Sequence, residues 1–203
     1  MNDLDTAHLV ALAAALGWAS GVRLYLVVFL TGLAGALGWV ALPPGLHVLQ
    51  APLVLGASAV LATIEFIADK IPAVNALWDG LHTVLRVPGG ALLAAGVFGG
   101  DPTQWTLVAA LAGGALAATS HAAKTSTTAS LAAFPEPLTH TGLSLVSDLS
   151  VPAMLWLAFA HPLLFAVALV VVVASMVSIT VVLFRFLRAL ARRLAGRARR
   201  VNS

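Results

Sequence analysis

The sequence contains no cysteine and very little charge. Of its 203 residues, 60% are hydrophobic and only 9% are Asp, Glu, Lys or Arg. The absence of cysteine excludes disulfide bonds, thiolate metal sites and cysteine nucleophiles. The low charge and the mean hydropathy of +0.99 exclude an ordinary soluble domain, in which about a quarter of the residues are charged. The composition predicts an all-α integral membrane protein.

Several catalytic motifs are also missing. The sequence has no GxSxG nucleophile motif, no phosphate-binding loop, no dinucleotide fingerprint and no HExxH pair. An enzyme would have to rely on the proximity of Ser120, His121 and Lys124, so we expect a protein that is not an enzyme and that has no cofactor. A metal ion stays an open question, because neighbouring carboxylates can bind hard cations.

The positive charge is concentrated after the last apolar run. The net charge is +3, and seven arginines lie between residues 185 and 200. A basic cluster directly after a hydrophobic helix is typical of a cytoplasmic segment beside anionic lipid. The cluster has few interleaved aromatic residues, so we expect membrane lipids rather than nucleic acid as partners. The acidic first residues lack the basic region of a signal peptide, and we expect no cleavage there.

Prolines and glycines divide the apolar sequence into segments, from which we expect about six transmembrane helices. An amphipathic segment follows the second crossing and is expected to lie on the membrane surface or to fold back into the protein. A short apolar segment after Pro88 either spans or re-enters the membrane. The expected crossings are residues 9–40, 51–68, 105–132, 142–160 and 163–184, the amphipathic segment is 73–86, and the short segment is 91–98.

A weak internal repeat is present at an offset of 101 residues, and it pairs Arg23 with Lys124. Three crossings in each half would make the two repeats inverted, as in many secondary transporters. We therefore expect a first repeat at residues 1–100, a second at 101–187 and a basic cytoplasmic tail at 188–203. This topology places both termini in the cytoplasm of a bacterial inner membrane. A homo-oligomer is compatible with it.

Ionisable residues inside apolar segments are the main functional signal. A charge at the bilayer centre costs at least ~2.5 kcal/mol, so few are kept without use. Arg23 and Lys124 could instead only hold the bundle together, and Glu65 and Asp69 could form a solvated helix end. The candidate ion- or substrate-binding residues are Arg23, Glu65, Asp69, Lys70, Asp79, His82, Arg86, His121, Lys124 and Asp148.

The sequence EFIADKIPAVNALWDGLHTVLRVPGGA, which begins at Glu65, resembles the signature block of an uncharacterised bacterial multi-pass membrane family of unknown function. The resemblance extends to the SGVRLY block around Arg23 and the HAAK block around His121. Thr128, Ser147 and Asn75 depart from the family pattern. The EFIADK segment also faintly resembles the Glu-x-Gly-Asp-Lys-Thr motif of cation/proton exchangers. The first resemblance implies a membrane architecture but no substrate.

We therefore expect a transporter of a small ion or a charged headgroup, coupled to protons or to another ion. The acidic residues would bind a cation or proton, and a neutral His121 could relay protons. If the substrate is an anion, Arg23 and Lys124 become its ligands. The alternatives are a membrane enzyme that acts on a lipid phosphate and a non-catalytic scaffold.

Overall fold

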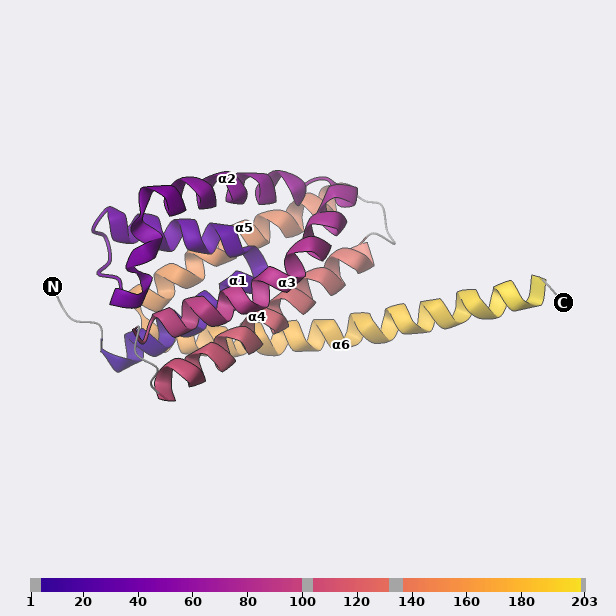
Figure 1. Cartoon of the computed structure of the whole chain (residues 1–203). Helices are drawn as coiled ribbons and strands as arrows, with labels where there is room; N and C mark the ends of the chain where they lie inside the picture. Colours follow the sequence, from indigo (N-terminus) through magenta and orange to yellow (C-terminus); the bar gives the residue numbers. More distant parts are fainter. Residues whose placement is uncertain (1–4, 100–103, 132–136, 202–203) are drawn as a thin grey trace.

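The protein folds into a bundle of helices, and its computed structural model describes residues 5–99, 104–131 and 137–201 (Figure 1). The described residues form no strand, which agrees with the predicted all-α class. Most of the helices begin with a proline. Proline has no backbone N–H group, and the N–H groups of the first helical turn have no hydrogen-bond partner within the helix. The elements are α1 (Thr6–Ala36), the 3₁₀-helix η1 (Pro44–Gln50), α2 (Pro52–Ala68), α3 (Pro72–Gly96), α4 (Gln104–Leu131), α5 (Pro137–Ala160) and α6 (Pro162–Val201).

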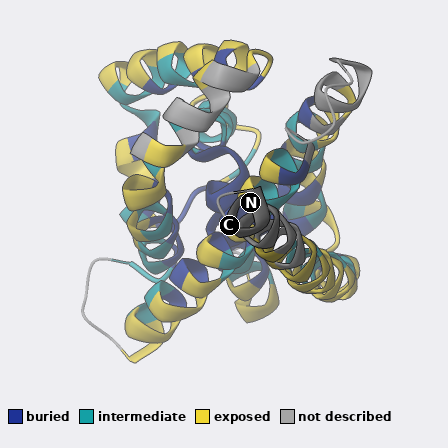
Figure 2. Cartoon of the chain, turned by 90° about the vertical axis from the view of Figure 1, so that its right-hand side faces the viewer, coloured by how far each residue is buried: buried dark blue, intermediate teal, exposed yellow. Residues whose placement is uncertain are grey.

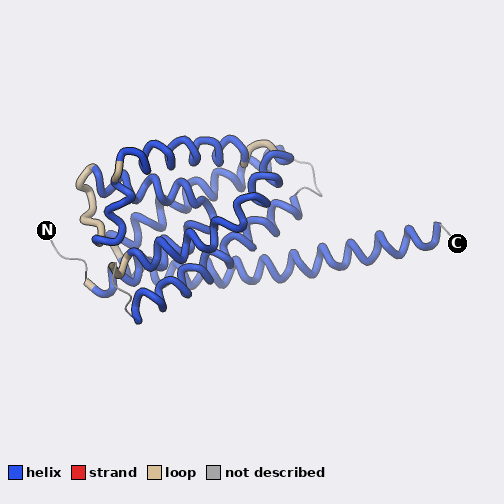
Figure 3. The backbone as a smooth tube through the Cα atoms, in the orientation of Figure 1, coloured by secondary structure: helices blue, strands red, loops and turns tan. Residues whose placement is uncertain are grey.

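Helix α1 reverses direction at Arg23, whose backbone is not helical (φ −149°, ψ 86°). The first arm runs beside α4, where Gly17 meets Gly113. The second arm returns along α2: Arg23 contacts Asp69 just after the end of α2, and Gly32 meets Leu49 and Leu55 near its start. Figure 3 shows the start of α1 and the loop that follows it at the same end of the bundle. The predicted first crossing is thus two antiparallel arms.

This reversal changes the predicted topology. The segments paired at the 101-residue offset run in the same direction, since Gly17 lies against Gly113 and Gly21 against Ala117. The two inverted three-helix repeats are therefore not confirmed. The extra pass also puts the start of α1 and the end of α6 at opposite ends of the bundle (Figure 1). The location of both termini in the cytoplasm stays a prediction.

The amphipathic segment 73–86 and the short segment 91–98 form one helix, α3, which continues through Pro88. The expected break at Pro88 is absent because membrane helices tolerate proline where neighbouring helices pack closely. Gly89 and Gly90 provide this contact against Leu24 and Ala117. Helix α5 continues through Pro152 in the same way.

Within the described part of the chain, three helices are long and apolar enough to cross a membrane by length and composition alone, namely Thr6–Ala36, Gln104–Ser130 and Pro162–Phe186. The first of them is α1, whose residues are divided between the two antiparallel arms. Helices η1 and α2 make a fourth candidate if their 69° bend is part of one broken span. In Figure 2 the buried residues lie in the middle of the bundle and the outer faces are exposed. The exposed side chains include many large apolar ones, such as Leu53, Leu111 and Leu163, as expected for helices in contact with lipid. These features are consistent with an all-α membrane protein.

We predict that Gly21→Ala destabilises the protein, because a Cβ at Gly21 would clash with the Ala117 carbonyl and the Ser120 hydroxyl on α4. Overpacking of this kind costs about 1–3 kcal/mol. Gly56→Ala is the matched control, since no atom lies within 4 Å of the position that its Cβ would take and alanine favours the helix. Thermal unfolding in detergent should give a lower midpoint for Gly21→Ala only. Equal midpoints for the two variants would contradict the close packing of α1 on α4.

Candidate functional site

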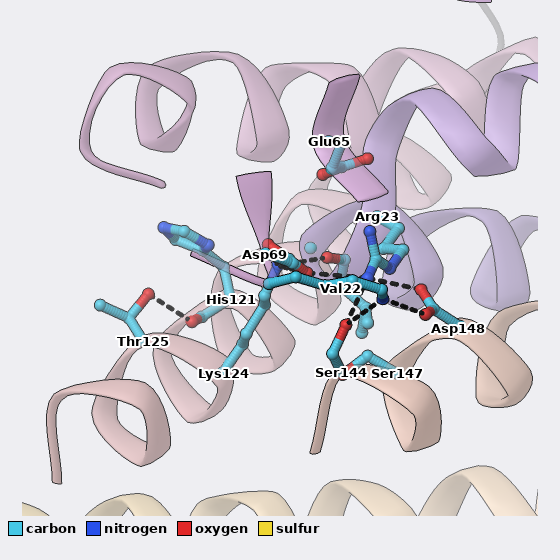
Figure 4. A network of polar contacts seen from close by, with 12 residues as sticks. Val22, Arg23, Glu65, Asp69, His121, Lys124, Thr125, Ser144, Ser147 and Asp148 are labelled. Atoms are coloured by element: carbon cyan, nitrogen blue, oxygen red, sulfur yellow. Dashed lines mark hydrogen bonds and ion pairs between the residues drawn. The ribbon is translucent and has the colours of Figure 1, made fainter. Parts of the chain in front are cut away.

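Arg23 lies at the centre of a buried group of charges, at the point where α1 reverses (Figure 4). Its Nη2 atom is 2.8 Å from Asp69 Oδ2 and 2.5 Å from Asp148 Oδ1, and it donates a hydrogen bond to Ser144. The Arg23 side chain is only 1% exposed. One guanidinium therefore joins α1 to carboxylates from the end of α2 and from α5.

Lys124 approaches the same carboxylate from α4. Its Nζ atom lies 3.1 Å and 3.0 Å from the two oxygens of Asp69, and 3.5 Å from the backbone carbonyl of Val22. That carbonyl is near the end of the first arm of α1, where the break removes helical hydrogen bonds. A cation at such a carbonyl end is favoured by the helix dipole. Asp69 is thus held between Arg23 and Lys124.

A second ion pair lies beside the first group. Arg86 Nη2 on α3 is 2.8 Å from Glu65 Oε1 on α2, and the two side chains are 0% and 1% exposed. Arg86 Nη1 also donates to His121 Nδ1 at 3.1 Å. Because Nδ1 accepts that bond, His121 Nε2 carries the hydrogen and donates to the Thr83 hydroxyl at 2.8 Å. These contacts fix a neutral tautomer of His121.

Among the described side chains, the buried charges of the site balance. Three cations, Arg23, Arg86 and Lys124, have side chains at most 7% exposed, and three carboxylates, Glu65, Asp69 and Asp148, are at most 15% exposed. Lys70 is 33% exposed and lies at the edge, 3.8 Å from Asp148 and above the Phe66 ring. We name the six buried residues the charge cluster. A balanced cluster avoids the large cost of an isolated buried charge.

Eight of the ten residues singled out in the sequence thus lie in or beside the charge cluster. His82 does not: its ring stacks on Trp78 at 4.0 Å, and its Nδ1 atom donates to the Trp78 carbonyl. Asp79 lies in α3, but its side chain is outside the described residues. Among the described residues, no group of three or more His, Asp or Glu is arranged to hold a metal ion.

Sequence reasoning missed the hydroxyls that complete the site. Ser144 receives hydrogen bonds from both Arg23 and Lys70, and Thr83 contacts His121. Ser144 precedes Asp148 by one helical turn, and this spacing could have revealed it. The Val22 and Gly21 carbonyls gave no signal in the sequence, because only the break at Arg23 makes them available.

The family model described as Domain of unknown function (DUF4126) matches residues 10–181, and the chain therefore belongs to this family. The match includes every residue of the charge cluster. No curated protein and no solved structure matches the chain. Family membership names no activity, so a functional proposal must rest on the geometry of the site.

We predict that Arg86→Met destabilises the protein by about 3–5 kcal/mol, because it leaves the Glu65 carboxylate buried without its cation. The double variant Arg86→Met/Glu65→Gln removes both charges and should recover part of this loss. Unfolding in detergent measures both effects. Arg188→Met, at an exposed position on α6, is the control and should unfold like the unaltered protein. A double variant less stable than Arg86→Met alone would argue against the pairing.

Proposed function

We propose that this membrane protein transports a small ion in exchange for, or together with, a proton, and that the charge cluster is the binding site. The observation that carries this proposal is the gathering of six buried, mutually balanced charges from five helices at the reversal of α1. Charges inside a membrane protein are expensive and typically mark ion pathways or proton relays. A broken helix with buried ionisable groups is also a common feature of transporter binding sites.

The balance of the cluster supports coupling to a proton. Each carboxylate faces at least one cation: Asp69 faces Arg23 and Lys124, Asp148 faces Arg23, and Glu65 faces Arg86. When a carboxylate takes up a proton, it stops compensating its cation, and the cluster gains one net positive charge. An anion that enters at that moment restores the balance. Release of the proton would then expel the anion.

The unused hydrogen-bond donors of Arg23 favour an anion over a cation as the transported ion. The Nε and Nη1 groups of Arg23 are buried and donate no hydrogen bond to the described residues, whereas Asp69, Asp148 and Ser144 all contact its Nη2 atom. A planar guanidinium can hold an oxyanion through two parallel hydrogen bonds. Arg23 could therefore bind an oxyanion without first losing both carboxylates.

We further propose an orientation in a bacterial inner membrane. The turn after α2, which contains Lys70, and the arginine-rich end of α6 lie towards one end of the bundle (Figure 1). The positive-inside rule assigns this end to the cytoplasm. Trp39, Trp105 and Trp156 are exposed near the other end, as expected for an aromatic belt at a membrane interface. The start of α1 would then face outward, and the charge cluster would lie nearer to the cytoplasmic face.

Proteoliposomes with an imposed proton gradient test the proposal. We expect the protein to accumulate at least one anion from a panel of chloride, acetate, phosphate and sulfate, and a pH dye inside the vesicles should report accompanying proton movement. Asp148→Asn keeps the size of the side chain but cannot exchange a proton, so coupled uptake should fall at least tenfold. Asp5→Asn changes an exposed carboxylate far from the cluster and keeps a good helix cap, and it should transport normally.

The same vesicles also separate the rival explanations. Uptake of Na⁺ or K⁺ without any anion would contradict the proposal that the transported ion is an anion, but it would agree with ion transport. Folded protein that moves none of these ions, or Asp148→Asn protein with undiminished coupled uptake, would contradict the proposed role of the cluster.

A further inference from the structure

A second site lies at the end of the bundle opposite the arginine-rich end of α6. There the second arm of α1, the loop after it, η1 and the last two turns of α5 line a half-open pocket of about 1010 Å³. This volume is at the upper end of the usual range for small-molecule sites. The pocket is separate from the charge cluster, because none of the six cluster residues lines it.

The wall of the pocket is mainly apolar, with a few polar groups. Leu30, Leu155 and Phe159 are among the apolar side chains, and Trp39 and Trp156 are 74% and 62% exposed. An apolar pocket with a small number of placed polar groups is typical of a ligand site. The helices around the pocket carry exposed apolar side chains, so a membrane would surround the pocket with lipids.

Three polar residues are among those that line the pocket, namely Thr31, His47 and Gln50. The Thr31 hydroxyl is buried, with the residue 1% exposed, and it has no hydrogen-bond partner among the described residues. His47 donates from Nε2 to the Leu42 carbonyl, which leaves Nδ1 as an acceptor, and Gln50 carries an amide. A buried hydroxyl without a partner is unusual in native proteins and points to a missing partner group.

No Asp, Glu, Lys or Arg is among the described residues that line the pocket. A charged head group would lose its hydration there without gaining a counter-charge, which is strongly unfavourable. An uncharged hydroxyl or carbonyl group could instead hydrogen-bond to Thr31, His47 or Gln50. We propose that this pocket binds an uncharged amphiphile from the membrane, with one long apolar chain and an oxygen-containing head that hydrogen-bonds to Thr31.

Tryptophan quenching by brominated amphiphiles tests this proposal, because Trp39 and Trp156 line the pocket and the other three tryptophans do not. The probes are a monoacylglycerol with a brominated chain, the ionised fatty acid of the same chain, and a trimethylammonium with that chain. We expect saturable quenching by the neutral probe with an apparent Kd at least tenfold lower than for either charged probe. The double variant Trp39→Phe/Trp156→Phe should lose this signal.

Two variants and one control test whether the quenching reports binding in the pocket. Ala34→Phe fills the pocket and should raise the apparent Kd of the neutral probe at least tenfold, whereas Ala36→Phe, at an exposed position outside the lining, should not. Thr31→Val removes only the hydroxyl. It should weaken binding of the neutral probe and yet raise the unfolding midpoint of the ligand-free protein, since an unpaired buried group is destabilising.

Quenching that does not saturate, that is equal for neutral and charged probes, or that persists unchanged in Ala34→Phe would overturn the proposal. If Ala34→Phe does not fold, Thr31→Val decides the question, and unchanged affinity in that variant would contradict the hydrogen bond to the head group. None of these readouts requires ion transport, so the proposed function can fail without affecting this site.

Discussion

The cost of a charge in an apolar environment governs this structure. The buried ion pairs connect segments that are far apart in the chain: Arg23 on α1 joins Asp69 after α2 and Asp148 on α5, and Arg86 on α3 joins Glu65 on α2. If one of these segments moved away, it would leave an uncompensated charge in a poorly solvated interior. The requirement for electrical balance therefore helps to set the relative positions of α1, α2, α3, α4 and α5.

The reversal of α1 depends on the same charges. A break inside a membrane-embedded helix exposes backbone carbonyls, and these must find partners within the protein. Arg86 and Lys124 approach the carbonyls of Gly21 and Val22 at the break, each at 3.5 Å. The Ser120 hydroxyl donates to the Trp18 carbonyl one turn earlier. The two cations thus have two tasks, since they pair with carboxylates and also compensate the broken backbone.

Close packing of small residues brings these cations within reach. A side chain at Gly90 on α3 would meet Ala117 on α4 and the Gly17 carbonyl on α1, and one at Gly113 would meet Ala94 and the Gly90 carbonyl. Glycine lets three backbones approach each other at this crossing, as in other membrane helices. Larger residues would move α3 and α4 outward, away from the end of the first arm of α1.

The sequence was sufficient to identify the charges but not the path of the chain. Arg23, Glu65 and Lys124 stand out because each interrupts an apolar segment, and the cost of that interruption marked them as candidate binding residues. The glycines at 17 and 21 permit a break just before Arg23, but the sequence does not show that the chain reverses direction there, because residues 24–36 continue the apolar run without a proline. The predicted inverted repeat depended on counting residues 9–40 as one crossing, and the reversal changes that count.

The two proposed sites share their supporting elements, and this has a mechanical consequence. Arg23 precedes the second arm of α1, which carries Thr31, while α5 carries both Asp148 and, one turn later, Pro152 at the pocket. The Arg23–Asp148 contact and the pocket are therefore both formed between the second arm of α1 and α5. A separation of these two segments that widened the pocket near Pro152 would also lengthen the ion pair one turn away. Because packed interfaces prefer discrete arrangements over gradual deformation, the state of the ion pair and the shape of the pocket are expected to change together.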